Sequence, residues 1–418
     1  MADHLPTAAE VVVIGAGLAG LATAHHLESA GLAVTVLERA EDVGGRVRTD
    51  NVDGFRLDHG FQLYNPAYPE GRAVFDHAAL DLRGFERGAR VVSGTRTHRL
   101  GDPRVHPTWA LESLRGGLVT TAGLAAFAAY AVGCARATPA SLRARPDLPI
   151  RDALTAARVP AGVLDDLVRP FLSGVFLETD LATSRRYADL VLRSFVRGTP
   201  AVPALGMAEL PRQLAGRCAD VHTGTEVTGI APGVVRTVHG SVRADAVVVA
   251  TDARAAARLV PGYPEPVGMN SCTTWYFVPD QPPTELADGL GILTVDADPG
   301  GPVVNTAVLT NAAPSYAPPG RSLVAATAVG LAAGVNEDAV RTQLSRLYSI
   351  STAGWEGIGV YHISDALPRA LTPFSPQRPV TLGDGLFTAG DHLDTPSIQG
   401  ALVSGRRAAA AVREHLGR

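Results

Sequence analysis

The chain has 418 residues, of which 46% are hydrophobic and 19% charged, and its formal net charge is −4. This length predicts two domains with a large buried core. The weakly acidic balance excludes the basic face that binding to nucleic acid requires. All 37 basic residues are arginine, because the sequence contains no lysine. The three cysteines are widely spaced and indicate neither a disulfide framework nor a metal site. The first ten residues are polar, so we expect no signal peptide and a cytoplasmic location.

The first element expected along the chain is a short buried strand over residues 11–14, followed by a glycine-rich turn. Gly15, Gly17 and Gly20 form a G-x-G-x-x-G pattern. These glycines allow a tight turn, close approach of the backbone to a diphosphate, and close packing of a helix on the strand. The N-terminus of that helix directs free N–H groups at phosphates. The pattern therefore predicts a dinucleotide site.

A second short strand, residues 33–37, ends at Glu38. The spacing from Gly20 to Glu38 is typical of the acid that binds the ribose hydroxyls in such a βαβ unit. A glutamate here, rather than an arginine, argues against a ribose 2′-phosphate.

Directly after Glu38, residues 39–49 read RAEDVGGRVRT. This segment resembles the second glycine motif of the flavin amine oxidase, phytoene desaturase and protoporphyrinogen oxidase superfamily. The resemblance implies that the dinucleotide is FAD. Gly44 and Gly45 permit close backbone approach, and Arg46 offers donors to diphosphate or flavin oxygens.

The C-terminal segment 385–405 resembles the same superfamily. That resemblance implies that Asp391 binds the ribityl chain or the diphosphate edge. It also implies that Gln399, Gly400 and Ala401 place a helix N-terminus against the pyrimidine side of the flavin, where the helix dipole favours negative charge on the reduced ring. No cysteine lies near this segment, so we expect noncovalent FAD.

Two middle regions extend the resemblance. Residues 198–214 look like the stretch that returns the chain to the flavin domain, and residues 225–230 and 244–251 look like the strand pair under the adenine. By position, Val227 would offer its backbone to the adenine edge. The predicted cofactor-binding residues are Gly15, Gly17, Leu18, Ala19, Gly20, Glu38, Arg39, Gly44, Gly45, Arg46, Val227, Gly390, Asp391, Gln399, Gly400 and Ala401.

The predicted fold class is α/β. A Rossmann-like FAD-binding domain with a parallel sheet is expected over residues 1–66, 200–262 and 378–418. A substrate-binding domain with a mixed sheet and helices interrupts it, over residues 67–199 and 263–377. The first insertion is predicted to be mostly helical, with helices over residues 108–134, 150–157 and 161–172. The second is predicted to hold a helix over residues 336–348 and strands over residues 272–278, 303–309, 323–328 and 357–363.

Residues 116–134 carry no charge and approach the length of a membrane-spanning helix. They are rich in alanine, glycine and threonine, which gain little on insertion into lipid. A buried or lid helix of the substrate domain is therefore favoured, with peripheral membrane contact as the alternative.

The absence of lysine bears on the reaction. In the amine oxidase branch a lysine commonly holds a water near flavin N5, and that arrangement cannot occur here. Residues 58–62, 313–320 and 366–369 also look more like the phytoene-desaturase-related side. We expect an FAD-dependent oxidoreductase that dehydrogenates an apolar or mixed small molecule by hydride transfer to flavin N5. Oxygen, a quinone or a diffusing partner would accept the electrons.

Side-chain catalysts are harder to predict, because the flavin carries the redox chemistry. His59 is a candidate proton acceptor with Gln62 beside it, although a structural role for His59 stays open. Aromatic residues on expected strands either line the substrate side or pack in the core. The predicted substrate-side residues are Tyr64, Trp275, Tyr276, Tyr361 and His362.

Two alternative functions remain open at this level. Reduced FAD could serve the isomerisation of a polyene or prenyl substrate without net oxidation. The fold also occurs in prenyl-binding escort proteins without a working flavin, against which the intact Gly-Gly-Arg loop, Glu38 and Asp391 argue.

Overall fold

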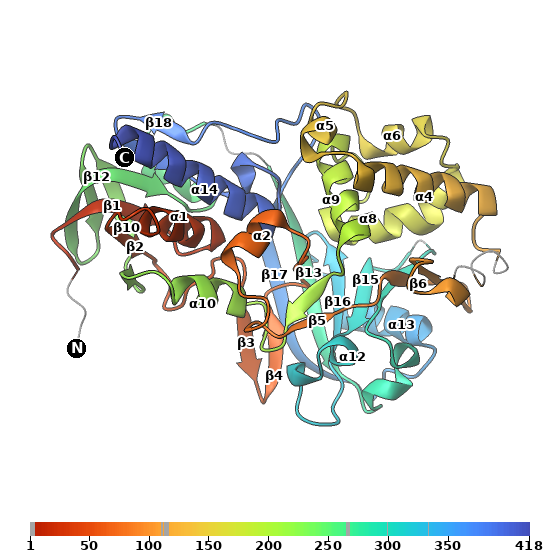
Figure 1. Cartoon of the computed structure of the whole chain (residues 1–418). Helices are drawn as coiled ribbons and strands as arrows, with labels where there is room; N and C mark the ends of the chain where they lie inside the picture. Colours follow the sequence, from red (N-terminus) through yellow and green to blue (C-terminus); the bar gives the residue numbers. More distant parts are fainter. Residues whose placement is uncertain (1–4, 110–111, 113–116, 265–267, 299, 333) are drawn as a thin grey trace.

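The computed structural model describes residues 5–109, 112, 117–264, 268–298, 300–332 and 334–418. Its two large sheets lie side by side along the molecule, one on the left of Figure 1 and one right of centre, and helices pack on both. Eight strands form the first sheet and seven form the second.

The eight-stranded sheet is parallel at its centre, where β1 (Ala8–Ile14) lies between β12 (Gly240–Val249) and β2 (Val34–Leu37). Val11 and Val13 of β1 are fully buried, as expected of a strand covered on both faces. The other strands are β9 (Val221–His222), β10 (Val227–Ala231), β11 (Val234–Thr237), β18 (Thr381–Gly383) and β19 (Leu386–Thr388).

Two long helices pack against each other on one side of this sheet (Figure 1). They are α1 (Leu18–Glu28) and α14 (Ile398–His415). A Cβ atom at Gly405 of α14 would lie 2.5 Å from the Ala19 carbonyl oxygen of α1. The missing side chain therefore lets the two helix N-terminal halves approach closely.

The seven-stranded sheet has the order β17–β13–β16–β15–β14–β6–β7. One face packs on helix α13 (Glu337–Tyr348) through the buried side chains of Trp275, Phe277 and Leu344. The strands are β6 (Gly88–Ser93), β7 (Arg96–Gly101), β13 (Met269–Val278), β14 (Leu293–Asp296), β15 (Asn305–Val308), β16 (Val324–Val329) and β17 (Glu356–Pro368).

A layer of helices covers part of the opposite face of this sheet, on the upper right of Figure 1. Val91 and Val295 from the sheet share an apolar cluster with Val168 and Leu172 from the helices. The layer holds α4 (Thr121–Arg136), α5 (Pro139–Arg143), α6 (Ile150–Ala156), α7 (Ala161–Val163), a π-helical turn (Leu164–Val168), α8 (Arg169–Phe176) and α9 (Arg185–Arg197).

Shorter elements connect the sheets and helices. The ribbon β3 (Thr49–Val52) with β4 (Phe55–Asp58) and the pair β5 (Leu82–Gly84) with β8 (Ala201–Pro203) lie between the sheets. The short helices are α2 (Pro69–Val74), α10 (Glu209–Ala215), α11 (Ala253–Leu259) and α12 (Leu309–Ala312).

Asp58 links these parts at a buried junction. Its carboxylate accepts hydrogen bonds from the Thr49 hydroxyl (2.6 Å), the Met207 N–H (3.0 Å) and the Tyr316 hydroxyl (2.9 Å). Its carbonyl oxygen accepts a bond from the Tyr276 hydroxyl at 2.7 Å. Burial raises the pKa of this carboxyl to about 6. The junction thus joins β3 and β4 to the seven-stranded sheet.

The first insertion is less helical than the sequence predicts. Strands β6 and β7 belong to the seven-stranded sheet, where β6 pairs in parallel with β14 about 200 residues later in the chain. Local periodicity does not report such a distant pairing. The strands over residues 227–231 and 240–249 are also not direct neighbours, because β11 lies between them.

The predicted helix over residues 108–134 is not continuous. Gly117 has a positive φ of 70°, and the Thr120 hydroxyl caps the start of α4 by accepting from the Gly123 N–H at 3.2 Å. Residues 110, 111 and 113–116 lie outside the described part of the chain. Among the described helices, none combines the length and apolar character needed to cross a membrane. The predicted strand over residues 303–309 ends one residue early, because Leu309 begins α12.

Candidate active site

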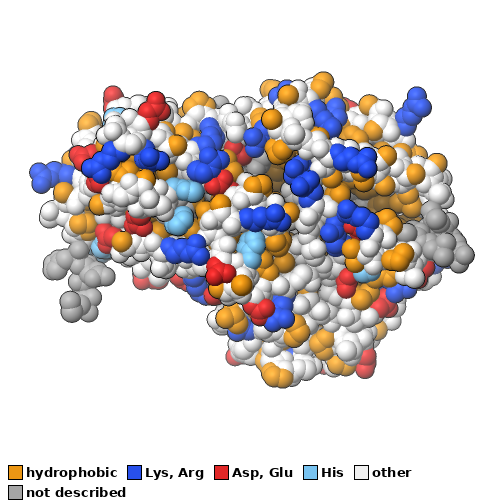
Figure 2. Space-filling model, in the orientation of Figure 1, with side chains coloured by type: hydrophobic (Ala, Val, Ile, Leu, Met, Phe, Trp, Pro, Cys, Tyr) orange, Lys and Arg blue, Asp and Glu red, His pale blue; other side chains and the backbone are white. Residues whose placement is uncertain are grey.

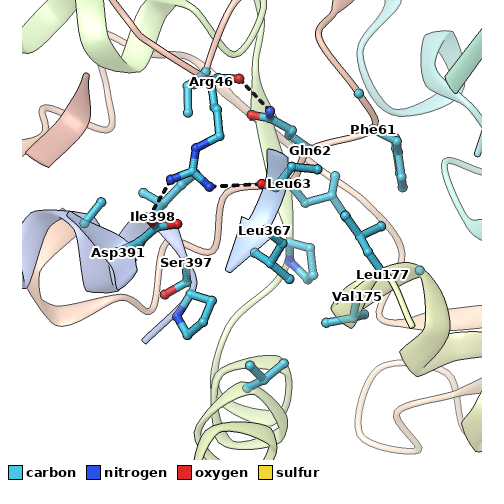
Figure 3. Close-up of a pocket in the computed structure, with 18 of the residues that line it drawn as sticks. Arg46, Phe61, Gln62, Leu63, Val175, Leu177, Leu367, Asp391, Ser397 and Ile398 are labelled. Carbon is cyan, nitrogen blue, oxygen red and sulfur yellow. Dashed lines mark hydrogen bonds and ion pairs between the residues drawn. The ribbon is translucent and has the colours of Figure 1, made fainter. Parts of the chain in front are cut away.

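A large cavity of about 2350 Å³ runs from the carboxyl end of β1 to the helical layer. Its first part is lined by backbone and charged side chains around the glycine-rich turn. Its second part is lined by apolar side chains. Figure 3 shows where the two parts meet, with Arg46 and Asp391 on one side and Phe61, Val175 and Leu177 on the other.

The glycine-rich turn forms an open cradle at the start of α1. Gly15 has a φ of +104°, and a Cβ atom there would lie 2.9 Å from the Ala250 carbonyl oxygen. Gly17 lies beside Gly44 in a parallel bridge, so the two glycine motifs meet. No side chain caps the N-terminus of α1, and Gly17, Leu18 and Ala19 line the cavity there. The first turn thus leaves N–H groups for an anionic ligand.

Glu38 lies at the end of β2 with its side chain buried. One carboxylate oxygen accepts from the Ala16 N–H at 2.8 Å, and the other accepts from the Ala40 N–H at 2.9 Å. Each oxygen keeps a lone pair, so the fixed carboxylate can still accept a bond from a ribose hydroxyl. Arg39 and Val227 line the same part of the cavity.

Arg46 follows the second glycine motif and reaches the C-terminal part of the chain. Its guanidinium pairs with Asp391 at 2.5 Å and donates to the Ala366 carbonyl at 3.0 Å (Figure 3). Burial acts to lower the pKa of Arg46, but the Asp391 carboxylate raises it above its ordinary value. Arg46 is therefore a fixed cation at the cavity wall. Gly390, which precedes Asp391, also lines the cavity.

The N-terminus of α14 reaches the same wall. The Ser397 hydroxyl accepts from the Gly400 N–H at 3.1 Å, and Ser397 and Ala401 line the cavity. Gln399 turns away, because its side-chain oxygen accepts from the Glu70 N–H at 3.1 Å. Gly400 is also not a lining residue, since a Cβ there would lie 1.8 Å from the Thr395 carbonyl oxygen.

Gly20 likewise does not line the cavity. A Cβ atom there would lie 1.9 Å from the Gly15 carbonyl oxygen, so this glycine serves the close packing of α1 on β1. The other predicted cofactor residues, apart from Gln399 and Gly400, all come together along one wall.

This wall has what a dinucleotide needs. An acid is fixed for a ribose, and an uncapped helix N-terminus is open for a diphosphate. A paired arginine and a second helix N-terminus lie along the same cavity. These features define a dinucleotide-binding oxidoreductase fold whose cofactor site opens into an apolar chamber.

The family model described as "Flavin containing amine oxidoreductase" matches residues 18–413, so the chain belongs to this family. Membership of this family makes the chain a flavin-dependent oxidoreductase, in line with the FAD site that the motifs predict. This agrees with the resemblance and with the predicted α/β fold.

Similar curated proteins match over short segments. Protoporphyrinogen oxidase 2 of Arabidopsis thaliana is 34% identical over 126 residues, covering 29% of this chain and 24% of that protein. Putrescine oxidase of Kocuria rosea is 44% identical over 91 residues, covering 21% and 19%. Phytoene dehydrogenase of Streptomyces griseus is 58% identical over 50 residues, covering 12% and 10%. Each match spans about a quarter or less of the relative.

Solved structures share the fold along nearly the whole chain. A putative protoporphyrinogen oxidase from Exiguobacterium sp. 255-15 has a TM-score of 0.74 at 19% identity, covering 99% of this chain and 100% of that one. A putrescine oxidase bound to putrescine has a TM-score of 0.71 at 18% identity, covering 98% and 99%. Cyclohexylamine oxidase from Brevibacterium oxydans IH-35A has a TM-score of 0.71 at 17% identity, covering 99% and 100%.

His59 and Gln62 both line the cavity. His59 Nε2 lies 2.9 Å from an Asp50 carboxylate oxygen, and its ring centroid is 4.7 Å from that of Tyr361. The Gln62 amide donates to the carbonyls of Arg46 at 2.8 Å and His59 at 3.1 Å (Figure 3). Gln62 therefore fixes the backbone of the Gly-Gly-Arg loop, while the His59 ring is held by a carboxylate.

Of the predicted substrate-side residues, only His362 is among those that line the cavity. Tyr64 is fully buried with its hydroxyl 2.8 Å from His77 Nε2, and Tyr276 is fully buried with its hydroxyl on Asp58. Trp275 packs on the α13 side of the sheet, opposite the helical layer. Tyr361 donates to Asp50 at 2.8 Å and contacts His59 rather than the cavity.

The apolar chamber comes mostly from residues that the sequence did not single out. Its walls are α4, the 167–177 segment and α9, which face β14 and β15. The uncharged stretch of α4 is the one sequence feature that points to this chamber. The small side chains of its alanines leave room between the helices and the sheet. The apolar lining residues of these segments include Leu124, Ala125, Phe127, Ala128, Ala131, Val132, Ala135, Leu167, Val168, Phe171, Val175, Leu177, Val191, Leu192, Phe195 and Val196.

Proposed function

We propose that this enzyme dehydrogenates an apolar or mixed small-molecule substrate, with noncovalent FAD as the hydride acceptor. When bound, FAD supplies the redox chemistry by taking the hydride at flavin N5. The observation that carries this proposal is the apolar lining of the chamber, which continues into the helical layer. The chamber begins at the wall that holds Gly17, Glu38, Arg46 and Asp391, which we call the FAD wall. An apolar lining of this extent favours a hydrocarbon body by removing its surface from water.

The charge of the chamber argues against a polyamine substrate. Among the described lining residues of α4, α9 and the 167–177 segment, none is an aspartate or glutamate. A substrate ammonium group would lose its hydration there without gaining a carboxylate partner, which is costly. The absence of lysine also removes the residue that amine oxidases commonly place near N5. The phytoene dehydrogenase relative supports the desaturase direction.

We further propose the domain division that the sequence suggests. The FAD-binding part would comprise residues 1–66, 200–262 and 378–418, and the substrate part residues 67–199 and 263–377. This division is supported by the strands of the eight-stranded sheet, all drawn from the first set, and those of the seven-stranded sheet, all drawn from the second.

We also propose His59 as the proton acceptor, positioned by Asp50. Burial acts to raise the pKa of Asp50, but hydrogen bonds from Tyr361 and His59 lower it below its ordinary value. The carboxylate therefore stays charged beside the imidazole. His59→Ala should slow flavin reduction by substrate about 100-fold while FAD stays bound. Anaerobic rapid mixing measures the rate, and His239→Ala, at an exposed histidine outside the cavity lining, is the control. An unchanged rate in His59→Ala would remove His59 from the mechanism.

The function itself is tested by anaerobic mixing of the FAD-loaded enzyme with a panel of small molecules. The panel contains prenyl and polyene hydrocarbons, their alcohols and acids, putrescine, and NADPH. We expect members with a hydrocarbon body to bleach the flavin absorbance band and to yield a product lighter by a pair of hydrogens. Bleaching by putrescine alone would contradict the proposal. Product isomers without loss of hydrogen, formed only after prior reduction, would favour the isomerase alternative.

A further inference from the structure

The outer end of the chamber is lined by arginines, although the protein as a whole is weakly acidic. Figure 2 shows a hollow with hydrophobic side chains inside it and basic side chains along its border, over the region of the helical layer. The arginines that line this end are Arg87, Arg104, Arg136 and Arg197, with Glu86 and Asp102 as the accompanying acids. Positive charge is therefore in excess at this end of the chamber.

Two of these arginines already have acidic partners. Arg87 and Arg104 both bind the Asp102 carboxylate, at 2.9 and 2.6 Å, and both donate to the Val196 carbonyl at the end of α9. Glu86 pairs with His106 at 2.9 Å. Both acids therefore lie against groups other than Arg136 and Arg197.

Arg136 and Arg197 have no such partners. Arg197 donates to the Ala135 carbonyl at 3.3 Å, which brings its guanidinium to the end of α4. For Arg136, no hydrogen bond or ion pair occurs within the described residues. Both side chains are exposed and both line the chamber. The N–H donors of Arg136 are therefore available to a ligand.

Helix capping explains only part of this cluster. Cations at helix C-termini are favourable, and Arg193 donates to the Ala137 carbonyl at 3.1 Å just beyond α4. Burial and the neighbouring charge of Arg197 lower the pKa of Arg193, which indicates crowded positive charge. Arg136 itself adds a favourable charge in the last turn of α4, but Arg193 and Arg197 are the arginines that donate to carbonyls there, at Ala137 and Ala135.

We propose that Arg136 and Arg197 form an anion-binding subsite, which holds the carboxylate or phosphate head group of an amphiphilic substrate whose apolar body extends along the chamber toward Arg46. This inference deepens the proposed function and depends on its apolar chamber. Guanidinium groups match the paired oxygens of such head groups. The head group would fix the depth of the hydrocarbon chain relative to the FAD wall.

The subsite is tested by binding, without turnover, to the oxidised FAD-loaded enzyme. Decanoate, decyl phosphate and decanol have the same chain and differ in the head group, and their binding is followed by the change in flavin absorbance. Decanoate or decyl phosphate should bind at least about tenfold more tightly than decanol. The tighter of the two anions identifies the head group. The double variant Arg136→Gln/Arg197→Gln should lose this preference and bind decanol as the wild type does. Arg151→Gln, at an exposed arginine on α6 outside the cavity lining, is the matched control and should keep the preference.

The outcomes separate this proposal from the function on which it rests. Equal affinity of the wild type for all three ligands would contradict the anion subsite and leave the apolar chamber supported. Loss of decanol binding in the double variant to the same degree as decanoate would show a purely structural role and overturn the subsite. Binding of none of the three ligands would contradict the apolar chamber and the subsite together.

Discussion

Glu38 shows how a single side chain is prepared for the cofactor. Both of its oxygens are held by backbone N–H groups, at Ala16 and Ala40. A carboxylate that is already positioned loses little conformational entropy when a ribose binds, so its hydrogen bonds contribute fully to affinity. The motif predicted this residue, but only the structure shows what fixes it.

Glu38→Gln should weaken FAD binding by about 1.5–3 kcal/mol, the range for hydrogen bonds to a charged group. Titration of the apoprotein with FAD, followed by flavin fluorescence, measures the change. Glu41→Gln, at an exposed glutamate outside the cavity lining, should leave the affinity unaltered. Equal affinity of the Glu38→Gln variant and the wild type would contradict the ribose assignment.

Asp58 predicts a pH dependence of stability. Burial raises its pKa to about 6 in the folded chain, from an ordinary value of 3.8. The folded state therefore holds the proton more tightly than the unfolded state, and stability falls as pH rises from about 4 to about 6. Asp58→Asn keeps the shape without ionising. Between pH 4 and 7, its free energy of unfolding should rise relative to wild type by about 3 kcal/mol. Urea unfolding at several pH values tests this, and parallel profiles would count against it.

At the scale of elements, the approach of α1 to α14 sets the geometry of the FAD wall. Both helices present their N-termini to the cavity, and Gly405 lets their backbones approach each other at Ala19. The distance between the two N-termini therefore depends on one missing side chain.

Gly405→Ala should lower the free energy of unfolding by about 1–3 kcal/mol, because its Cβ would lie 2.5 Å from a backbone oxygen that cannot easily move. The bound FAD fraction after purification should also fall. Gly133→Ala in α4 is the control, since a Cβ there meets no atom within 4 Å, and it should be neutral or stabilising. Thermal unfolding of both variants measures the two effects, and the melting temperature should fall for Gly405→Ala alone. Similar melting temperatures would refute the packing argument.

The elements that sequence predicts well are those with local signals. Residues 11–38 carry a buried strand, a glycine turn and an acid in fixed order, and the structure places them as expected. Helix α13 and strand β13 follow their apolar patterns in the same way. The sequence does not predict strands β6 and β7, because β6 is held in the sheet by the distant strand β14 and β7 pairs with β6 at the sheet edge.

The candidate site also has one part with local sequence signals and one part without them. The wall that we assign to FAD contains motifs whose glycines and charges are visible in the sequence, and most of the residues predicted to bind the cofactor line the cavity there. The chamber is a space between helices and a sheet, and its lining depends on which faces of α4, α8 and α9 point inward. Tyr64, Trp275 and Tyr276 were expected on the substrate side but are packed in the core, since burial of aromatic surface is favourable wherever strands allow it.

At the scale of the whole molecule, the two sheets and the helical layer enclose one continuous cavity. The eight-stranded sheet provides the FAD wall, and the helices over the seven-stranded sheet provide the apolar chamber. The proposed binding of substrate requires an open chamber, and the small side chains of the alanines on α4 leave that space free. Ala128 and its neighbour Ala129 are both exposed, but of the two only Ala128 lines the chamber.

The most direct measurement compares flavin reduction in Ala128→Phe and Ala129→Phe, using the hydrocarbon-bodied compound that reduces the wild-type flavin fastest. A phenyl ring at position 128 fills the chamber, so the anaerobic reduction rate should fall about tenfold or more, while FAD content and reduction by dithionite stay unchanged. The Ala129→Phe variant should react as the wild type does. Equal rates in the two variants would contradict the claim that the apolar chamber holds the substrate.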